Sequence, residues 1–363
     1  MSTYGKNLIL SIFGESHGPA IGAVLDGLPA GEEIDEQALA EFLKKRSPGR
    51  DASMTARKEK DQPRFLSGLY RGKTTGTPLA FVMENTDTRS QDYAETSEKF
   101  RPGHADYTGF VRYGGFADPR GGGHFSGRLT APLVAAGGIC KQILARRGVE
   151  IAGHIFSIAG IGDAPLNAVN VTKQQLSSLQ ASDFPLVEPA LETKMRAAIA
   201  EAAAERNSVG GCVECIAVGL PAGIGSPMFS GLENRIAQLA FGIPAVKGIE
   251  FGSGFGVCAM TGAQCNDEFY SDDGKILTRT NHNGGILGGI SNGMPLIFRL
   301  AVKPTPSIAA EQHTVTRRGE EALLAVNGRH DPCIVPRAVP CAESALAVAL
   351  LDAMLERGLP SAN

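Results

Sequence analysis

Clusters of adjacent glycines limit the fold of this chain more than any other feature of its sequence. The chain has 45 glycines among 363 residues, and several are neighbours, as in Gly121-Gly122-Gly123, Gly284-Gly285 and Gly288-Gly289. Glycine adopts backbone conformations that other residues avoid, and it leaves room for close approach. We therefore expect the backbone to turn sharply, or to come close to another group, at each cluster.

The hydrophobic pattern between these clusters predicts short strands and longer helices. Residues 7–13 and 21–25 are expected to form a hairpin, and Asp35 is expected to cap a helix that ends before Pro48. Further strands are predicted over 210–219, 245–251, 256–261 and 296–302, and further helices over 129–147, 192–206 and 342–357. Small residues over 135–138 predict close packing of one helix. This mixture indicates the α+β class.

The sequence shows no Pro/Ser-rich linker, charge block or change in composition, so we expect one large domain over 1–363. No hydrophobic stretch approaches the length of a membrane span, and the run 8–13 is too short for a signal peptide, which predicts a cytoplasmic protein without a membrane partner. Seven cysteines, an odd number, indicate reduced thiols. Cys212 and Cys215 lie in an apolar, strand-like run, where packing is favoured over metal or redox chemistry.

Charge is distributed unevenly along the chain. The net charge of −3 gives no support for a nucleic-acid partner. Between residues 101 and 128, however, only Asp106 and Asp118 are negative, whereas Arg101, Arg112, Arg120, Arg128, His104 and His124 are positive or can become so. This segment predicts a local cationic patch.

Two histidines lie in segments that suit acid–base chemistry. The run 14–19 (Gly-Glu-Ser-His-Gly-Pro) places Ser16 and His17 on a turn directly after a strand, and a structural turn histidine explains it as well as a catalytic one. In the run 101–106, Asp106 or a backbone carbonyl would orient His104 beside an anion.

The glycine run 121–123 continues through Ser126 and Arg128 into a predicted helix. Backbone N–H groups, the helix N-terminus and Arg128 together predict an anion site, and a mobile surface loop is the alternative. The spacing is neither that of a Walker loop nor that of a Rossmann fingerprint.

Two polar segments near the C-terminus complete the candidate site. Residues 303–307 (Lys-Pro-Thr-Pro-Ser) offer a cation and hydroxyls on a proline-stiffened turn. Arg329, His330 and Asp331 are followed by Arg337 in a proline-locked segment that precedes the last helix. Rigid loops often hold catalytic groups, although a surface cluster of salt bridges is the alternative.

Taken together, these segments resemble the chorismate synthase family along nearly the whole chain. The matching runs are 14–18, 46–49, 84–87, 89–93, 101–106, 122–130, 245–248, 283–289, 303–307 and 328–333. The resemblance implies a β-α-β sandwich fold and a homotetramer. It also implies a 1,4-elimination of phosphate and a ring proton from 5-enolpyruvylshikimate 3-phosphate, which gives chorismate in the shikimate pathway to aromatic amino acids. The reaction uses reduced FMN without net redox change.

The resemblance also implies a role for each site residue. The catalytic groups would be His17, His104 and Asp331, with Ser16 and Ser126 assisting proton handling, and no metal is expected. The substrate-binding arginines would be Arg46, Arg101, Arg128 and Arg329. The flavin would contact His124, Phe125, Ser126, Pro244, Ala245, Gly288, Lys303, Pro304, Thr305, Pro306, Ser307 and Arg329. NADPH would act only indirectly, through an external flavin reductase.

This chain departs from the common family pattern at four positions. His124 and Leu129 stand where many members have arginine and glutamate, which lowers the positive charge near the glycine run above neutral pH. Ala52 and Pro306 stand where arginine and serine are frequent. These positions put individual contacts to phosphate and flavin in doubt.

Two other functions are compatible with the motifs. A flavin-dependent oxidoreductase acting on a phosphorylated, anionic substrate would share the cofactor but consume a reductant in each turnover. A non-catalytic anion- or nucleotide-binding protein would explain the glycines and arginines, but not two histidines and an aspartate in three separate loops. A nucleic-acid role is least favoured, since only 6% of the residues are aromatic.

Overall fold

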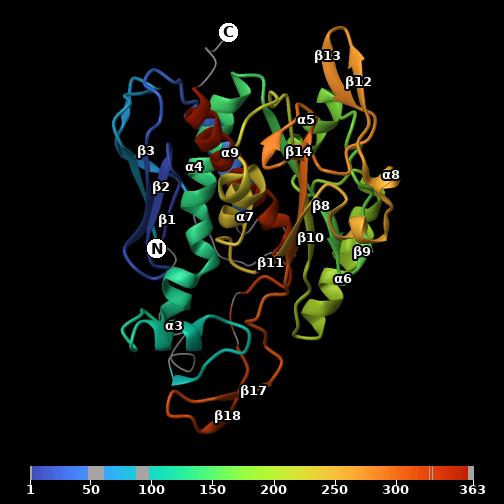
Figure 1. The fold of residues 1–363 in the computed structure, drawn as a ribbon. Coiled ribbons are helices and arrows are strands. Elements are labelled where there is room, and N and C mark those ends of the chain that lie inside the picture. Colours follow the sequence, from blue (N-terminus) through green and yellow to red (C-terminus); the bar gives the residue numbers. More distant parts are fainter. Residues whose placement is uncertain (1, 48–60, 87–97, 327, 329, 359–363) are drawn as a thin grey trace.

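Two antiparallel sheets enclose a layer of helices in the computed structural model of the chain (Figure 1). The structure describes residues 2–47, 61–86, 98–326, 328 and 330–358. The arrangement confirms the α+β class and the β-α-β sandwich that the family resemblance implies.

The first sheet contains the predicted N-terminal hairpin. Its strands run in the order β1 (Thr3–Tyr4), β2 (Ile9–Gly14), β3 (Ala20–Asp26), β7 (Leu79–Glu84) and β4 (Arg64–Ser67). In the hairpin, Ile9 lies opposite Asp26 and Gly14 lies opposite Ile21. The turn of this hairpin therefore displays Glu15, Ser16 and His17.

The second sheet has the order β11 (Val246–Phe251), β16 (Leu296–Val302), β10 (Gly211–Val218), β8 (Glu150–Ile158) and β9 (Ile161–Gly162). Cys212 and Cys215 are free thiols on β10, and burial raises the pKa of Cys212 to about 11. A thiol that stays protonated is a poor nucleophile and a poor metal ligand, which supports the packing role.

The middle layer consists of α1 (Glu36–Arg46), α4 (Thr130–Ala145), α7 (Leu232–Ala240) and α9 (Val335–Arg357), with α4 and α9 side by side (Figure 1). As predicted, the Asp35 side chain caps α1 by accepting hydrogen bonds from the backbone N–H groups of Gln37 and Ala38, both at 2.9 Å. Gly137 of α4 lies so close to Ser344 of α9 that a Cβ atom would overlap it. The small residues of α4 therefore do permit close packing.

Two sequence predictions fail in this layer and at the edge of the second sheet. The last helix begins at Val335, not at 342. Pro336 falls in its first turn, where a backbone N–H has no partner within the helix, so a proline is tolerated there. The helix then continues through Pro340. Residues 256–261 do not form a strand, since Gly254–Ala259 is a 3₁₀ helix, η6, entered through left-handed turns at Gly252 and Gly254.

The prediction that no apolar stretch approaches the length of a membrane span is wrong for helix α9. It has 23 residues and enough hydropathy, but 89% of its apolar window is buried inside the protein. Figure 1 shows it between the two sheets, which is the position of a core helix.

The remaining elements surround this sandwich. Helix α5 (Lys173–Ala181) covers the outer face of the second sheet through Leu176 and Leu179. The other helices are α3 (Asp106–Arg112), α6 (Glu192–Ala204), α8 (Gly262–Cys265), η2 (Arg120–Phe125), η3 (Gly127–Leu129), η4 (Pro189–Leu191) and η5 (Met228–Ser230). The hairpins are β5–β6 (Leu69–Tyr70, Lys73–Thr74), β12–β13 (Phe269–Asp272, Lys275–Thr278), β14–β15 (Ile286–Leu287, Ile290–Ser291) and β17–β18 (Gln312–Val315, Glu321–Leu324).

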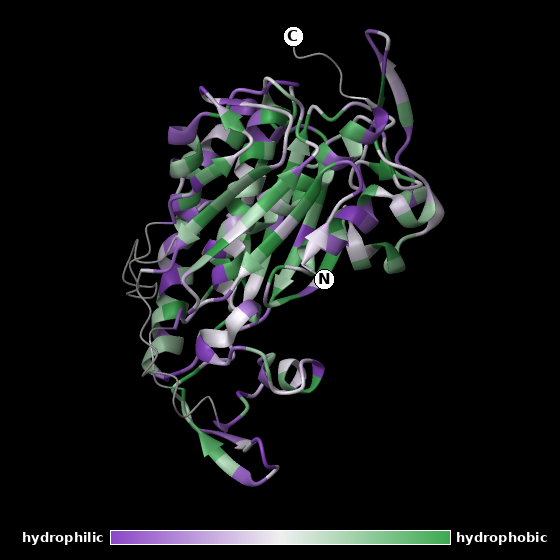
Figure 2. Ribbon diagram, turned by 90° about the vertical axis from the view of Figure 1, so that its left-hand side faces the viewer, coloured by the Kyte–Doolittle hydropathy of each residue, from purple (hydrophilic) through white to green (hydrophobic). Residues whose placement is uncertain are grey.

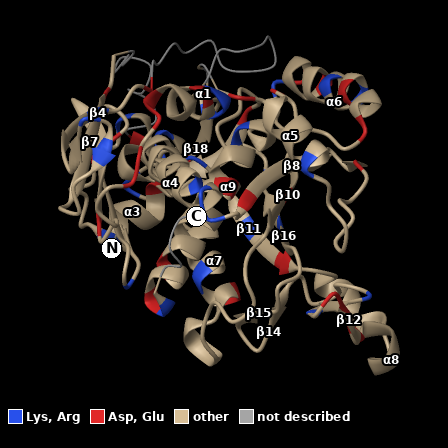
Figure 3. Ribbon diagram, turned by 90° about the horizontal axis from the view of Figure 1, so that it is seen from above, with Lys and Arg blue, Asp and Glu red and all other residues tan. Residues whose placement is uncertain are grey.

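Hydrophobic residues gather in the strands and inner helix faces, and hydrophilic residues in loops and outer faces (Figure 2). Figure 3 shows lysine and arginine interspersed with aspartate and glutamate in the view from above, and α6 carries both signs. The arginines of the candidate site, Arg46, Arg101 and Arg128, are instead buried inside the protein.

Candidate active site

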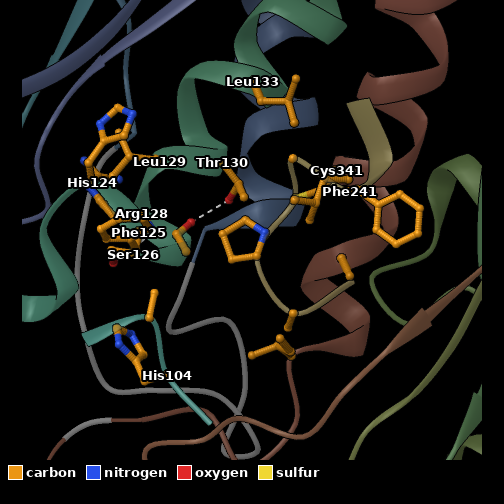
Figure 4. A pocket seen from close by; sticks show the side chains of 18 of the residues that line it. His104, His124, Phe125, Ser126, Arg128, Leu129, Thr130, Leu133, Phe241 and Cys341 are labelled. Atoms are coloured by element: carbon orange, nitrogen blue, oxygen red, sulfur yellow. Dashed lines mark hydrogen bonds between the residues drawn. The ribbon is translucent and has the colours of Figure 1, made fainter. Parts of the chain in front are cut away.

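A cavity of about 920 Å³ lies where the first turns of α4 and α9 meet the first sheet and the loops around residues 103 and 305. This volume is near the upper end of ordinary small-molecule sites, so the cavity has room for a cofactor and a substrate together. Figure 4 shows part of its wall, with Thr130 and Leu133 from α4, Cys341 from α9 and His104 from the loop before α3.

The glycine run 121–123 packs against both predicted catalytic histidines, of which His104 lines the cavity and His17 does not. A Cβ atom on Gly121 would overlap the ring of His17, and one on Gly122 would lie 3.1 Å from the ring of His104. Both glycines have positive φ angles, +60° and +88°. The structure shows that these glycines make room for two imidazoles, and the exposure of their N–H groups to an anion stays a prediction.

The first hairpin is tied to the same glycine run. The backbone N–H of Ser16 donates to the carbonyl of Gly123 at 3.1 Å. Ser16 and His17 are both buried and do not line the cavity, whereas Gly121, which packs against the His17 ring, does. The Ser16 Oγ atom has no hydrogen-bond partner among the described residues.

His104 is oriented by an acid, as its sequence context suggested. Its Nδ1 atom lies 2.6 Å from Asp106 Oδ1, and the other carboxylate oxygen of Asp106 accepts from Arg101 Nε at 2.7 Å. Burial alone would raise the pKa of Asp106, but the hydrogen bonds from Arg101 and His104 hold it well below its ordinary value. Asp106 therefore presents an ionised carboxylate to the His104 ring.

Two predicted substrate arginines, Arg46 and Arg128, share one buried carboxylate. Arg46 Nη1 lies 2.7 Å from Asp61 Oδ2, and Arg128 Nη1 bonds to the other oxygen. Burial of Asp61 opposes ionisation, but the two arginines lower its pKa to about 2. Arg46 also donates through Nε to Thr130 Oγ1 at 3.1 Å. Sequence reasoning missed Asp61, because a lone acid in a polar stretch carries no signal.

Arg337 belongs to a segment that the sequence placed in the candidate site, but the sequence assigned no role to it. It lines the cavity together with Asp331, and its Nη1 atom donates to the Asp331 carboxylate. Its Nε atom donates to the backbone carbonyl of Arg46 at 2.8 Å. Burial lowers the pKa of Arg337, but an arginine guanidinium stays charged at neutral pH.

Most residues predicted to contact a flavin line this same cavity. They are His124, Phe125, Ser126, Pro244, Ala245, Lys303, Thr305, Pro306 and Ser307. Thr305 Oγ1 is buried without a hydrogen-bond partner among the described residues, and Ala245 has a φ angle of +76°, which is strained for a residue with a Cβ atom. A wall with a buried, unused hydroxyl and backbone strain is typical of a ligand site.

Three predicted residues lie elsewhere or outside the described residues. Pro304 does not line the cavity, although both of its neighbours do. Gly288 belongs to the turn between β14 and β15, where the adjacent Gly289 packs against Ser226, and it is not part of the cavity wall. Arg329 lies outside the described residues, as does the family departure at Ala52.

The other departures from the family pattern lie in the cavity wall. His124 Nδ1 lies 2.8 Å from the carbonyl of Gly14, and its Nε2 lies 2.6 Å from Ser2 Oγ, so this histidine ties the N-terminus to the hairpin. Leu129 and Pro306 also line the cavity. Within the described part of the chain, no group of three or more His, Cys, Asp or Glu side chains could hold a metal ion.

Comparisons with known proteins agree with this geometry. Residues 8–355 match the sequence model of the family described as chorismate synthase. The chain is 46% identical to the chorismate synthase of Lancefieldella parvula, over 97% of this chain and 96% of that protein. It is 45% identical to that of Thermococcus kodakarensis, over 97% of each. A crystal structure of chorismate synthase superposes with a TM-score of 0.77 and 30% identity, covering 98% of this chain and 93% of the other.

Proposed function

Because this chain belongs to the chorismate synthase family, we propose that its cavity binds 5-enolpyruvylshikimate 3-phosphate beside reduced FMN and eliminates phosphate and a ring proton to form chorismate. The proposed activity is that of a carbon–oxygen lyase in the shikimate pathway to aromatic amino acids. One observation carries most weight. Two buried or half-buried histidines flank the same glycine run, and four arginines line the cavity beside it.

The arginines suit the charge of this substrate. Two carboxylates and a phosphate monoester give it a charge of about −3 to −4 near neutral pH. Arg46, Arg101 and Arg128 are already held by carboxylates and hydroxyls, so their guanidinium groups are pre-oriented. Guanidinium groups stay charged and bind carboxylate and phosphate in fixed geometry, which orients the substrate ring as well as retaining it.

The histidines would handle charge and protons. His104, held by Asp106, would stabilise negative charge on the phosphate or on the cofactor. His17 would donate a proton to the departing phosphate, with Ser16 beside it on the same turn. Ser126, which accepts a hydrogen bond from the Arg128 N–H at 3.3 Å, lies at the entrance to η3 and would complete the proton route.

Reduced FMN fits the remaining wall of the cavity. Lys303, Thr305 and Ser307 offer a cation and hydroxyls, and Phe125 and Ala245 offer an apolar surface. When bound there, reduced FMN would supply transient electron transfer that eases loss of phosphate, without net redox change. Asp331 would tune the protonation of the bound flavin ring.

The family also suggests the wider setting. We propose a cytoplasmic homotetramer whose flavin is reduced by a separate reductase that uses NADPH. The chain itself would use NADPH only through that reductase.

A product assay tests the proposed activity. Under anaerobic conditions with reduced FMN, the protein should release phosphate and form chorismate in equal amounts. His17→Ala and His104→Ala should each lower kcat by about 10²- to 10⁴-fold, the usual contribution of general acid–base catalysis. Binding of substrate without product would instead support an anion-binding protein, and unchanged kcat in both variants would remove the histidines from the mechanism.

A further inference from the structure

Arg337 occupies a position that helix stability does not explain. It lies in the first turn of α9, which contains no acidic residue. The N-terminus of a helix carries partial positive charge, so a cation in that turn is unfavourable. The guanidinium is also largely removed from water, because only 16% of the Arg337 side chain is exposed. A local arrangement that costs stability in this way is expected at functional sites.

The contacts of Arg337 join two parts of the proposed site. Nη1 donates to the carboxylate of Asp331, four residues before the helix, and Nε donates to the main-chain carbonyl of Arg46 at 2.8 Å. Arg46 is the last residue of α1 and directs its own guanidinium toward Asp61 and Thr130. One planar guanidinium thus sets the distance between Asp331 and the end of α1.

We propose that Arg337 is a positioning residue for the elimination reaction, which fixes the Asp331 carboxylate and the Arg46 segment relative to one another. This inference rests on the proposed function. A planar fork with two donors in fixed directions is needed, because a lysine ammonium can keep the charge but cannot hold both partners in this geometry. Small displacements of catalytic groups cost about 10²-fold in rate even when folding is intact.

The chain offers a matched control in Arg235 of α7. Its Nε donates to the Ser230 carbonyl at 3.0 Å and its Nη1 to Asp352 at 2.9 Å, as in Arg337, and its Nη2 also pairs with Glu356. Arg235 is similarly buried but does not line the cavity. Substitution of either arginine by lysine therefore removes an equivalent bond, and only one of them is part of the site.

The test compares Arg337→Lys and Arg235→Lys in the full protein. Both should lower Tm, and Arg235→Lys should do so at least as much, because it also disturbs the pair with Glu356. Arg337→Lys should lower kcat by about 10²-fold, while the dissociation constant of 5-enolpyruvylshikimate 3-phosphate, measured by calorimetry without flavin, changes only a few-fold. Arg235→Lys should keep the parent kcat. In an Asp331→Asn background, Arg337→Lys should add little further loss, because both changes remove the same contact.

Equal kcat for Arg337→Lys and Arg235→Lys would overturn the inference, as would full additivity with Asp331→Asn. If Arg337→Lys does not fold, Arg337→Gln, which keeps an amide donor for the Arg46 carbonyl, should show the same selective loss of kcat. A parent protein that forms no chorismate would overturn the proposed function and this inference with it. A parent that turns over normally while both Arg337 variants match it would overturn only the inference.

Discussion

Replacing Asp61 by asparagine should destabilise the protein and at the same time create a stronger anion site. The Asp61 carboxylate lies between Arg46 and Arg128, which lower its pKa from 3.8 to about 2. At about 1.36 kcal/mol per pKa unit, this difference corresponds to about 2 kcal/mol of folding free energy. With an unfolding entropy of about 2.1 cal/mol/K per residue over 363 residues, the expected fall in Tm is about 3 °C.

The pH dependence of this effect has a definite sign. The folded-state pKa of Asp61 is depressed, so its contribution is complete above about pH 4 and disappears as the pH falls toward 2. Urea unfolding at pH 7 should therefore separate parent and Asp61→Asn by the full amount. The two proteins should converge as the pH falls from about 4 to about 2.

Sulfate supplies the second half of the assay. Without the Asp61 carboxylate, the buried guanidinium groups of Arg46 and Arg128 lack the negative charge between them, so sulfate should raise the Tm of Asp61→Asn more than that of the parent. Asp352→Asn is the matched control, because Asp352 pairs with Arg235 outside the cavity. Equal rescue of both variants by sulfate, or no loss of stability in Asp61→Asn, would refute the reasoning.

Three further predictions concern other parts of the structure. Gly121→Ala should lower kcat strongly by displacing the His17 ring. The control is Gly148→Ala, which also has a positive φ angle but open space around its Cβ position, and which should lower stability only. Equal kcat in the two variants would contradict this. Arg128→Ala should weaken substrate affinity more than it lowers kcat, and an unchanged dissociation constant would disprove it. His154 is buried between Asp163 and Glu214. Burial opposes the charged form of His154, but the two carboxylates raise its pKa. Its stabilising charge is therefore present at low pH and lost as the pH rises. The loss of unfolding free energy in His154→Gln should accordingly be larger at pH 6 than at pH 9, which urea titrations at both values will measure.

The elements that the sequence predicted well are those with local signals. The helix capped by Asp35 and the hairpin that displays His17 depend on neighbours in the chain, and both are present. The segment around His104 and Asp106 is equally local, and the structure places the two side chains 2.6 Å apart.

The features that sequence reasoning missed depend on contacts between distant segments. Asp61 becomes important only because folding brings Arg46 and Arg128 to it. The glycine at position 121 could be recognised as a close approach, but not as a contact with His17, which is more than 100 residues away. Arg337 was placed in a loop because prolines flank it, whereas they lie within the first turns of α9.

The redox balance of a complete reaction tests the central claim most directly. The protein, dithionite-reduced FMN and excess 5-enolpyruvylshikimate 3-phosphate would be mixed anaerobically after removal of remaining dithionite, while chorismate absorbance and the flavin spectrum are followed together. We predict many molecules of chorismate per flavin, with the flavin still reduced at the end. One molecule of flavin oxidised for each product molecule would contradict the account and identify an oxidoreductase.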